Sequence, residues 1–491
     1  MRNKLFVSAP LVRIAVSLMA GIIVGIKLPL PYFPLLTATL VIALALWKYE
    51  LLQSAAICLC FIVLGALLAD RQQKDLQVEW PAGEIRYEAV VISSPVEKPK
   101  TIAVDILLPE SGRKLKCYLQ KDKRSRRLQV GDGLRLQSVI RPNRDWHIGT
   151  FNYRRYLEIH GFTGSTYVAG WKWQKAVVSL RPLPRTERTR LYFLKLRSRL
   201  LERLTDSGIE GEAYEVVAAM ALGDKTALTQ EVRELYAVTG ASHVLALSGL
   251  HLGIIYMLLS WLIIGRRWQT VSQLTILVSI WAFVFLVGMP TSVVRSAIML
   301  SFYILMALGH RDKMSVNTLA FAAILLLAFN PLALFDIGFQ MSFLAVFSIL
   351  TVIPLTERLI QPEFLMRHRI VKWLWGIISV SCAAQIGVAP LIAYYFGRFS
   401  TYFLLTNLVV IPAATLILYL SIAVLTVPSL GYLLSKTIGL LHAALKYLSS
   451  LPGANIEGLH PTVLQVAMTY VIIASVWLIL AVLPPNGPHR R

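Results

Sequence analysis

The chain has 491 residues, 56% of them hydrophobic, and its mean hydropathy is +0.61. A composition this apolar excludes a soluble multidomain enzyme, and the recurring runs of about 20 apolar residues predict a polytopic helical membrane protein. The formal net charge is +22, and residues 70–190 supply half of it, with 24 Lys and Arg against 13 Asp and Glu.

Apolar runs on both sides of this polar segment predict the membrane helices. Three runs come first and define an N-terminal membrane unit of residues 1–69; because two more spans follow the first, it is not a cleaved signal peptide. The runs are 10–30, 33–48, 52–69, 243–264, 271–288, 291–309, 314–329, 333–353, 373–395, 403–427 and 463–483, with 430–450 either amphipathic or spanning. We therefore expect about 10 to 12 transmembrane or re-entrant helices, with a channel-type membrane domain over 241–485.

Short basic loops predict the orientation in the cytoplasmic (inner) membrane. The positive-inside rule assigns them to the cytoplasm, together with both termini and a short tail at 486–491. These loops contain Arg2 and Lys4, Arg266-Arg267, residues 310–313, residues 367–372 and residues 489–491. The same count of spans leaves residues 70–190 outside the cytoplasm. Cys117 is the one cysteine of that segment, so no internal disulfide is expected there.

Residues 84–169 alternate with a period of two, which is typical of strands. Five runs separated by Pro, Gly or charge clusters read as strands: 84–94, 100–108, 113–120, 132–140 and 161–169. Five short strands in so short a segment favour a small OB-like β-barrel, with helical character at 151–159. Amphipathic helices are expected over 191–240, between this exported domain and the membrane.

Basic residues crowd on the predicted exported domain, interleaved with Tyr118, Trp146, Phe151, Tyr153 and Tyr156. A basic groove with aromatic platforms holds single-stranded nucleic acid without sequence preference. A solvated basic face, or one lying on anionic lipid, is the competing interpretation. The candidate DNA-binding residues are Lys114, Lys116, Lys121, Lys123, Arg124, Arg126, Arg127, Arg154 and Arg155.

Polar residues inside the predicted spans are costly in lipid and usually face a bundle interior or a water-filled path. On one continuous helix, His243, Ser248 and His251 would share one side, and Gly249 and Gly253 would allow close helix packing. The other candidates for a polar path are Arg295, Asp336, Gln340, Gln385 and Asn407.

Two chemical readings compete with a path. Ser248 and His251 are three residues apart and could form an intramembrane hydrolase, although no orienting acid is visible nearby. A metal site is weakly indicated, because the helical H-E-x-x-H pattern is absent. No cofactor is expected, and no G-K-[ST] phosphate loop encodes a motor. The roles of Asp224, Glu231 and Glu234 stay open.

With these residues in view, the chain resembles the ComEC competence-channel family over nearly its whole length. The matching motifs are ALGDK at 221–225, GASHVLALSGLHLG at 240–253, SVVRSAIM at 292–299, NPLALFDIGFQMSFLAV at 330–346 and AQIGVAPLIAYYFG at 384–397 followed by Asn407. The resemblance implies a non-enzymatic channel for single-stranded DNA in natural transformation, with His243, Ser248 and His251 lining or supporting the path. A transporter of another anionic polymer is an alternative that the same basic domain would serve.

The resemblance also implies partners and one departure. A DNA receptor outside, and a helicase-like motor with strand-binding proteins inside, are expected. Many family members carry a C-terminal metallo-β-lactamase-like domain, whereas this sequence stops at Arg491 and contains no H-x-H-x-D-H motif. We therefore expect a separate nuclease, a shorter lineage or a truncated chain.

Overall fold

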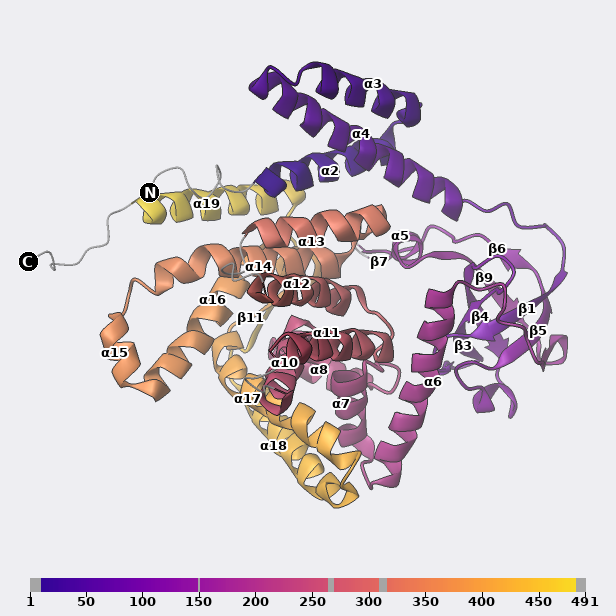
Figure 1. Cartoon of the computed structure of the whole chain (residues 1–491). Coiled ribbons are helices and arrows are strands. Elements are labelled where there is room, and N and C mark those ends of the chain that lie inside the picture. The colour runs from indigo at the N-terminus through magenta and orange to yellow at the C-terminus, as the bar shows by residue number, and fades with distance from the viewer. Residues whose placement is uncertain (1–9, 149–150, 264–268, 309–315, 483–491) are drawn as a thin grey trace, which may run out of the picture.

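The computed structural model describes residues 10–148, 151–263, 269–308 and 316–482. A stack of helices forms the larger part, and a sheet domain lies to one side of it (Figure 1). Most of the basic segments that predict the orientation lie outside the described residues: Arg2 and Lys4, Arg266-Arg267, residues 310–313 and the 486–491 tail. The orientation of the chain therefore stays a prediction.

The N-terminal unit consists of α2 (Pro10–Lys27), α3 (Tyr32–Ala45) and α4 (Glu50–Leu76). Small residues let α2 and α4 approach closely, as is common between membrane helices. A Cβ atom added at Gly25 would lie only 2.6 Å from the Cα atom of Ala66 on α4. The α2–α4 contact therefore depends on glycine at this position.

The sheet domain contains all five predicted strands, with bounds close to those expected. They are β1 (Ile85–Val91), β3 (Thr101–Leu107), β4 (Lys114–Gln120), β5 (Gly133–Ser138) and β9 (Phe162–Val168). Shorter pieces add β2 (Val96–Glu97), β6 (Ile140–Arg141) and β10 (Trp173–Lys175), and the strand order is β10-β5-β1-β3-β4-β9-β6, with β2 on β3. Inward residues such as Val104, Cys117 and Leu134 form its own core.

The strand directions and the short break between β5 and β6 distinguish this sheet. β4 and β9 run parallel, and all other pairings along the path are antiparallel. β5 and β6, which only Val139 separates, pair with β1 and β9 respectively. The sheet is thus established, while closure into an OB-like barrel stays a prediction. A second small pair, β7 (His147–Ile148) and β8 (Phe151–Asn152), leads into α5 (Tyr153–Ile159).

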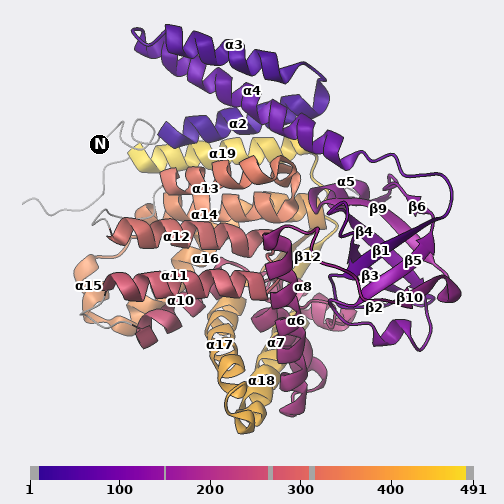
Figure 2. The ribbon, with the colours of Figure 1, turned by 45° about the vertical axis from the view of Figure 1, so that its right-hand side comes forward.

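Helices connect the sheet domain to the helical stack. α6 (Arg185–Asp206) runs between the two (Figure 2), and it buries Leu191, Leu194, Leu201 and Leu204 along one face. α7 (Gly211–Leu222) is buried over most of its length, and α8 (Gln230–Val238) follows it. A period of three to four between buried leucines is what an amphipathic helix produces.

The remaining apolar runs form helices: α10 (Gly249–Ile263), α11 (Gln269–Leu286), α12 (Thr291–Leu308), α13 (Val316–Phe329), α14 (Ile337–Thr356), α16 (Arg369–Phe396), α17 (Phe403–Val424), α18 (Gly431–Ser450) and α19 (Val463–Val482). Within the described ranges, six helices are long and apolar enough to span a membrane: α2, α4, α14, α16, α17 and α19. Five shorter apolar helices accompany them. A multi-pass helical membrane protein is therefore supported, and a count of 10 to 12 crossings stays a prediction.

Candidate functional site

The segment around the two histidines is not one helix, so the predicted shared face is wrong. His243 lies on α9 (Ser242–Leu245), a four-residue helix, and is exposed. The backbone then becomes extended at Ala246, with φ −87° and ψ 117°, before α10 begins at Gly249. The long helix of the predicted 243–264 run therefore begins only at Gly249.

Ser248 and His251 explain where this helix begins. The backbone N–H of Ser248 donates to Nδ1 of His251 at 3.3 Å, and the Ser248 Oγ atom lies 3.2 Å from the same nitrogen. His251 thus takes the position that Glu or Gln occupies in a capping box, three residues after the residue preceding the helix. In the sequence, the S-x-x-H spacing fits the middle of a helix equally well, so this capping motif was not predicted.

The cap also determines the tautomer of His251. A ring nitrogen that accepts from a backbone N–H must be unprotonated, so the neutral ring carries its proton on Nε2. The side chain is 0% exposed, and among the described residues Nε2 has no hydrogen-bond partner. A buried donor without a partner is costly to keep in an apolar helical stack.

Three segments that carry the family-like motifs meet around this turn. The Ser292 hydroxyl, at the start of α12, donates to the Leu247 carbonyl at 2.6 Å. A Cβ atom on Gly249 would lie 2.8 Å from Oγ of Ser296, so glycine permits this close approach. Beside Gly253 no atom lies within 4 Å of such a Cβ, and the predicted packing role fails there.

The start of α14 joins the same region. Asp336 caps α14 by accepting from the Gly338 N–H at 2.9 Å, and the Thr291 hydroxyl lies 3.4 Å from its other oxygen. Gln340 donates to the Leu334 carbonyl at 3.0 Å and accepts from the Tyr395 hydroxyl at 2.8 Å. These bonds hold α14 against α12 and α16, so the side chains of Asp336 and Gln340 both stabilise the packing of these helices.

Arg295 is the buried charge of the group. It lies on α12, is 2% exposed, and places its guanidinium carbon 5.4 Å from the ring centroid of Phe343 on α14. Asp336 is the acid whose charge acts on it, yet the two groups form no ion pair. Because it forms no ion pair with this acid, the buried arginine is held mainly by packing and by cation–π attraction to Phe343.

The two remaining path candidates lie elsewhere. Asn407 on α17 donates to the Ser381 hydroxyl of α16 at 3.1 Å, which is an interhelical bond of the ordinary kind. Gln385 is half-buried on α16 and, within the described part of the chain, makes no side-chain hydrogen bond. The structure therefore brings Ser248, His251, Arg295, Asp336 and Gln340 into neighbouring segments, while Gln385 and Asn407 form no hydrogen bond to these five among the described residues.

The predicted DNA-binding cluster on the sheet domain is mostly neutralised by ion pairs. Lys116 pairs with Asp105 at 2.5 Å, a partner directly across the β3–β4 register, and Lys121 pairs with Glu97 at 2.5 Å. The hydrogen bond from Lys121 lowers the pKa of Glu97, so the pair is charged on both sides at neutral pH. Six of the nine residues form such pairs: Lys114, Lys116, Lys121, Arg124, Arg126 and Arg154.

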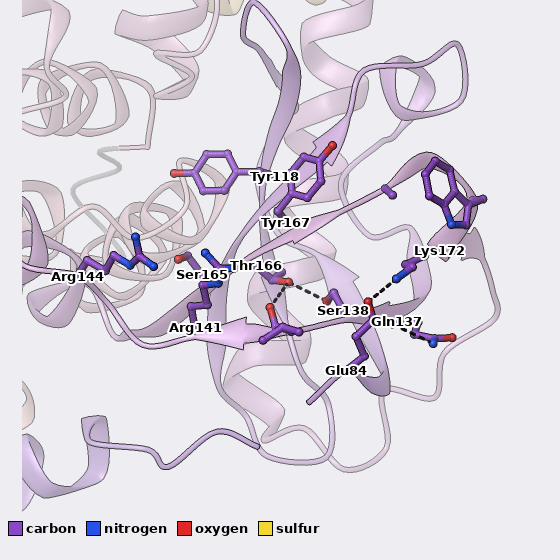
Figure 3. Close-up of a pocket in the computed structure, with 13 residues that line it drawn as sticks. Glu84, Tyr118, Gln137, Ser138, Arg141, Arg144, Ser165, Thr166, Tyr167 and Lys172 are labelled. Atoms are coloured by element: carbon purple, nitrogen blue, oxygen red, sulfur yellow. Dashed lines mark hydrogen bonds and ion pairs between the residues drawn. The ribbon is translucent and has the colours of Figure 1, made fainter. Parts of the chain in front are cut away.

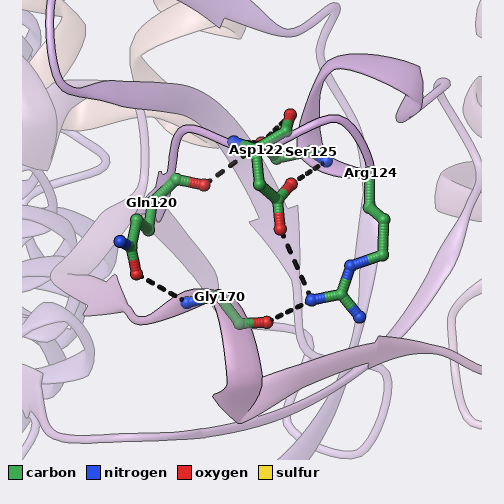
Figure 4. Close-up of polar contacts among 5 residues, drawn as sticks. All are labelled: Gln120, Asp122, Arg124, Ser125 and Gly170. Carbon is green, nitrogen blue, oxygen red and sulfur yellow. Dashed lines mark hydrogen bonds and ion pairs between the residues drawn. The ribbon is translucent and has the colours of Figure 1, made fainter.

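Arg124 shows what these cations do instead. Its guanidinium donates to the Gly170 carbonyl at 2.5 Å and contacts Asp122, while Asp122 also accepts from the Ser125 N–H (Figure 4). The residue thus fastens the 121–127 loop to the segment after β9. Among the described residues, Lys123 and Arg127 form no ion pair, and Arg155 lies over Phe335.

A pocket of about 540 Å³ lies on the sheet domain, and most of its lining residues were not predicted from the sequence. We call it the Tyr167 pocket (Figure 3). It is lined by Glu84, Tyr118, Gln137, Ser138, Val139, Arg141, Arg144, Ser165, Thr166, Tyr167, Ala169, Trp171 and Lys172. The period-two pattern of β4 and β9 could have indicated it, because it places Tyr118 and Tyr167 on the outward face.

Asp224, whose role the sequence left open, joins the two parts of the molecule. It is 5% exposed and accepts from the Ser94 hydroxyl of the sheet domain at 2.9 Å, and from the N–H and hydroxyl of Thr226. Glu234 pairs with Arg398 at 2.7 Å, which ties α8 to β11 (Arg398–Ser400). Glu231 lies in the first turn of α8, where a negative charge stabilises a helix.

No metal site emerges from the described ranges, where no three His, Cys, Asp or Glu side chains gather as ligands. The absence of enzymatic activity stays a prediction.

The features described so far define a polytopic membrane protein. It combines several apolar helices with a docked sheet domain and a polar turn at the start of α10. The family model described as Competence protein matches residues 220–483, which is more than half of the chain. The chain belongs to this family, and the resemblance read from the motifs is confirmed.

Two relatives accompany the family match. The chain is 26% identical over 362 residues to "ComE operon protein 3" of Bacillus subtilis (strain 168), covering 72% of this chain and 44% of the relative. It is 30% identical over 201 residues to an "Uncharacterized protein" of Aquifex aeolicus (strain VF5), covering 41% of this chain and 45% of the relative. The chain therefore spans less than half the length of either relative. No solved structure matches.

Proposed function

We propose that this chain forms the route by which single-stranded DNA crosses the cytoplasmic membrane during natural transformation, and that its sheet domain contacts the DNA outside. Membership of the competence family supports the cargo. Every nucleotide carries a charge that hydrocarbon excludes, so such a route requires polar groups within the helical part.

The observation that carries the proposal is the meeting of three polar segments in an apolar stack. The turn before α10, the start of α12 and the start of α14 are tied by the Ser292–Leu247 and Thr291–Asp336 contacts. Arg295 and His251 are buried there, and among the described residues Arg295 forms no ion pair and Nε2 of His251 has no hydrogen-bond partner. Groups this costly are usually kept in membrane proteins because a substrate uses them.

The surroundings of the route follow from the proposed topology. Both termini would face the cytoplasm, and the sheet domain would face outward, where a DNA receptor delivers the strand. A helicase-like motor and strand-binding proteins would draw the strand inward, since this sequence has no phosphate loop. A separate nuclease would degrade the strand that does not enter.

The fate of labelled DNA tests the proposal. Cells lacking the chain are complemented with wild type, with His251→Ala, or with nothing, and labelled DNA is followed into the periplasm and the cytoplasm. We expect DNA to reach the periplasm but not the cytoplasm without the chain, and His251→Ala to reduce entry. Equal entry with and without the chain would refute DNA as cargo and leave another anionic polymer as the candidate.

A hydrolase is the second candidate, because Oγ of Ser248 lies 3.2 Å from Nδ1 of His251. A nucleophile needs a base within this distance. The same Nδ1 atom, however, also faces the Ser248 N–H, and among the described residues no acid orients Nε2. This geometry suits a helix cap better than a catalytic dyad.

A further inference from the structure

We propose that the Tyr167 pocket, and not the basic cluster, is where the sheet domain holds single-stranded DNA. Bases would stack on Tyr167 and Trp171, and phosphates would pair with Arg141 and Arg144. The inference rests on the proposed function, because it locates the DNA contact that the function requires.

The aromatic residues of the pocket are unusually open. Tyr118 and Tyr167 are register partners on the parallel strands β4 and β9, so their side chains stand next to each other on the outward face. Tyr167 is 57% exposed, and Trp171, in the turn after β9, is 79% exposed. Large aromatic surfaces left in water beside one another provide the stacking platforms that single-stranded nucleic acid uses.

The cations of the pocket are available, in contrast to those of the basic cluster. Arg141 and Arg144 are exposed and, among the described residues, form no ion pair. Lys172 does pair with Glu84, and the Lys98 ammonium lies 4.9 Å from the ring centroid of Tyr118. A phosphate that binds Arg141 or Arg144 displaces only counterions, whereas one that binds Lys116 or Lys121 must compete with a carboxylate.

A hydrogen-bonded floor holds the pocket in shape. The Thr166 hydroxyl lies 2.7 Å from the Ser138 hydroxyl and 3.1 Å from the Val139 carbonyl, and the Tyr87 hydroxyl lies 2.7 Å from Ser138. Such a preformed site loses little conformational entropy when a ligand binds. Its volume of about 540 Å³ also falls within the range of ordinary ligand sites.

The aromatic surface continues from the pocket toward the helical stack. Tyr118 is a neighbour of Tyr153, and burial together with Tyr118 raises the pKa of the Tyr153 hydroxyl. Tyr153 stacks on Tyr156 with ring centroids 6.1 Å apart, both on α5. α5 in turn contacts the segment before α14 through Arg155 and Phe335. A strand leaving the pocket over Tyr118 would therefore be led toward the polar segments of the membrane part.

The stacking part of the inference is tested with the full chain in detergent and a fluorescent thymidine oligonucleotide. Tyr167→Ala and Trp171→Ala should each weaken binding by about 5-fold to about 100-fold, because a stacked base contributes on this scale. Tyr447→Ala, which removes an exposed aromatic of α18, is the matched control and should leave binding unchanged. An abasic oligonucleotide of equal length should bind wild type and Tyr167→Ala equally weakly.

The predicted phosphate contacts are tested by comparing two double variants, each of which removes two cations. Arg141→Ala with Arg144→Ala should reduce the slope of log affinity against log salt by about 1.4, corresponding to two phosphate contacts. Lys123→Ala with Arg127→Ala removes two cations of the basic cluster that form no ion pair among the described residues, and it should leave that slope unchanged.

The results separate this inference from the proposed function. If only the Lys123 and Arg127 variant weakens binding, or if the abasic oligonucleotide binds as well as the thymidine one, the Tyr167 pocket is not the site. If folded wild type binds no oligonucleotide, the sheet domain does not contact DNA at all. The DNA route itself fails only in the cellular experiment, when DNA enters cells without the chain. Import that is lost in Tyr167→Ala and kept in Tyr447→Ala supports both.

Discussion

Arg155 of the sheet domain places its guanidinium carbon 3.8 Å from the ring centroid of Phe335, in the η4 turn (Pro331–Phe335) that precedes α14. Next to it, Asn330 donates to the Ile159 carbonyl at the end of α5 and accepts from Gln72 of α4. The sheet domain is therefore fastened to the N-terminal helices and to α14 at one place.

We expect Arg155→Ala to loosen this attachment by about 0.5–1 kcal/mol, the usual contribution of an exposed cation–π contact. Combined with Asn330→Ala, it should increase protease cleavage in the segments that join the sheet domain to α4 and α6. Limited proteolysis of the purified protein measures this. Arg135→Ala, which breaks an exposed pair with Glu88 inside the sheet, is the control. Equal cleavage in all three proteins would contradict the role of this contact.

Substitutions of His251 and Ser248 distinguish a cap from a catalytic dyad. A glutamine at position 251 can still accept from the Ser248 N–H, as in a capping box, but cannot act as a base. We expect His251→Gln to retain most DNA entry, and His251→Ala to lose about 0.5–2 kcal/mol of stability, as cap removal does.

Ser248→Ala distinguishes the same two roles. If the route needs no nucleophile, Ser248→Ala should reduce DNA entry only partially. Complete loss of activity in both Ser248→Ala and His251→Gln would support the hydrolase instead. Labelled-DNA entry and protein level in the membrane fraction are the measurements for each variant.

Arg295 is expected to serve the substrate as well as the fold. Arg295→Gln keeps a polar side chain of similar length against Phe343 but removes the charge, so we expect the protein level to stay near wild type while DNA entry falls at least about tenfold. Immunoblotting of membranes alongside the entry assay checks both. Arg358→Gln, at an exposed position, is the matched control. A protein that disappears from the membrane would show that the charge is structural.

Alkaline pH should weaken the sheet domain through Tyr87. Burial raises the pKa of Tyr87 to about 12 from its usual 10.0. The folded state thus favours the neutral hydroxyl, so this stabilisation is fully present below about pH 10 and is lost as the pH rises from about 10 to about 12. Tyr87→Phe should lower stability near neutral pH by about 1 kcal/mol, because it loses a hydrogen bond to Ser138, but should flatten the alkaline decline.

Urea unfolding of the sheet segment with its linkers, residues 77–184, measures this at neutral pH and at about pH 11. The segment has a hydrophobic core of its own, which makes it suitable for the measurement. Identical alkaline declines in wild type and Tyr87→Phe would show that another group causes the loss.

The sequence predicted the strands and most helices because each depends on local periodicity. In β4, for example, the buried residues Leu115, Cys117 and Leu119 alternate with outward side chains. The same alternation can be seen in the amino-acid sequence. The helix assumed over residues 243–251 failed for a local reason too. Ser248 and His251 form a start signal that resembles mid-helix spacing when only the period is considered.

The candidate sites were harder to predict because their environment depends on distant residues. The basic cluster looked free in sequence, yet Lys114 meets Glu187, which is 73 positions away, and Lys116 meets Asp105 only through strand register. The Tyr167 pocket likewise combines β4, residues 137–144 and the segment from β9 to Lys172; the period of two shows that Tyr118 and Tyr167 point outward, but only the pairing of β4 with β9 brings them together.

The burial of Asp224 has an electrostatic consequence for the junction between the sheet domain and α7. A carboxylate left facing water there would project a negative potential and repel any polyanion that approached. Instead the charge is enclosed by hydroxyl and amide donors from Ser94 and Thr226, with the Arg197 guanidinium acting on it from α6. Asp224 therefore holds two parts of the molecule together, and its charge repels a polyanion at the surface above the junction less than an exposed carboxylate would.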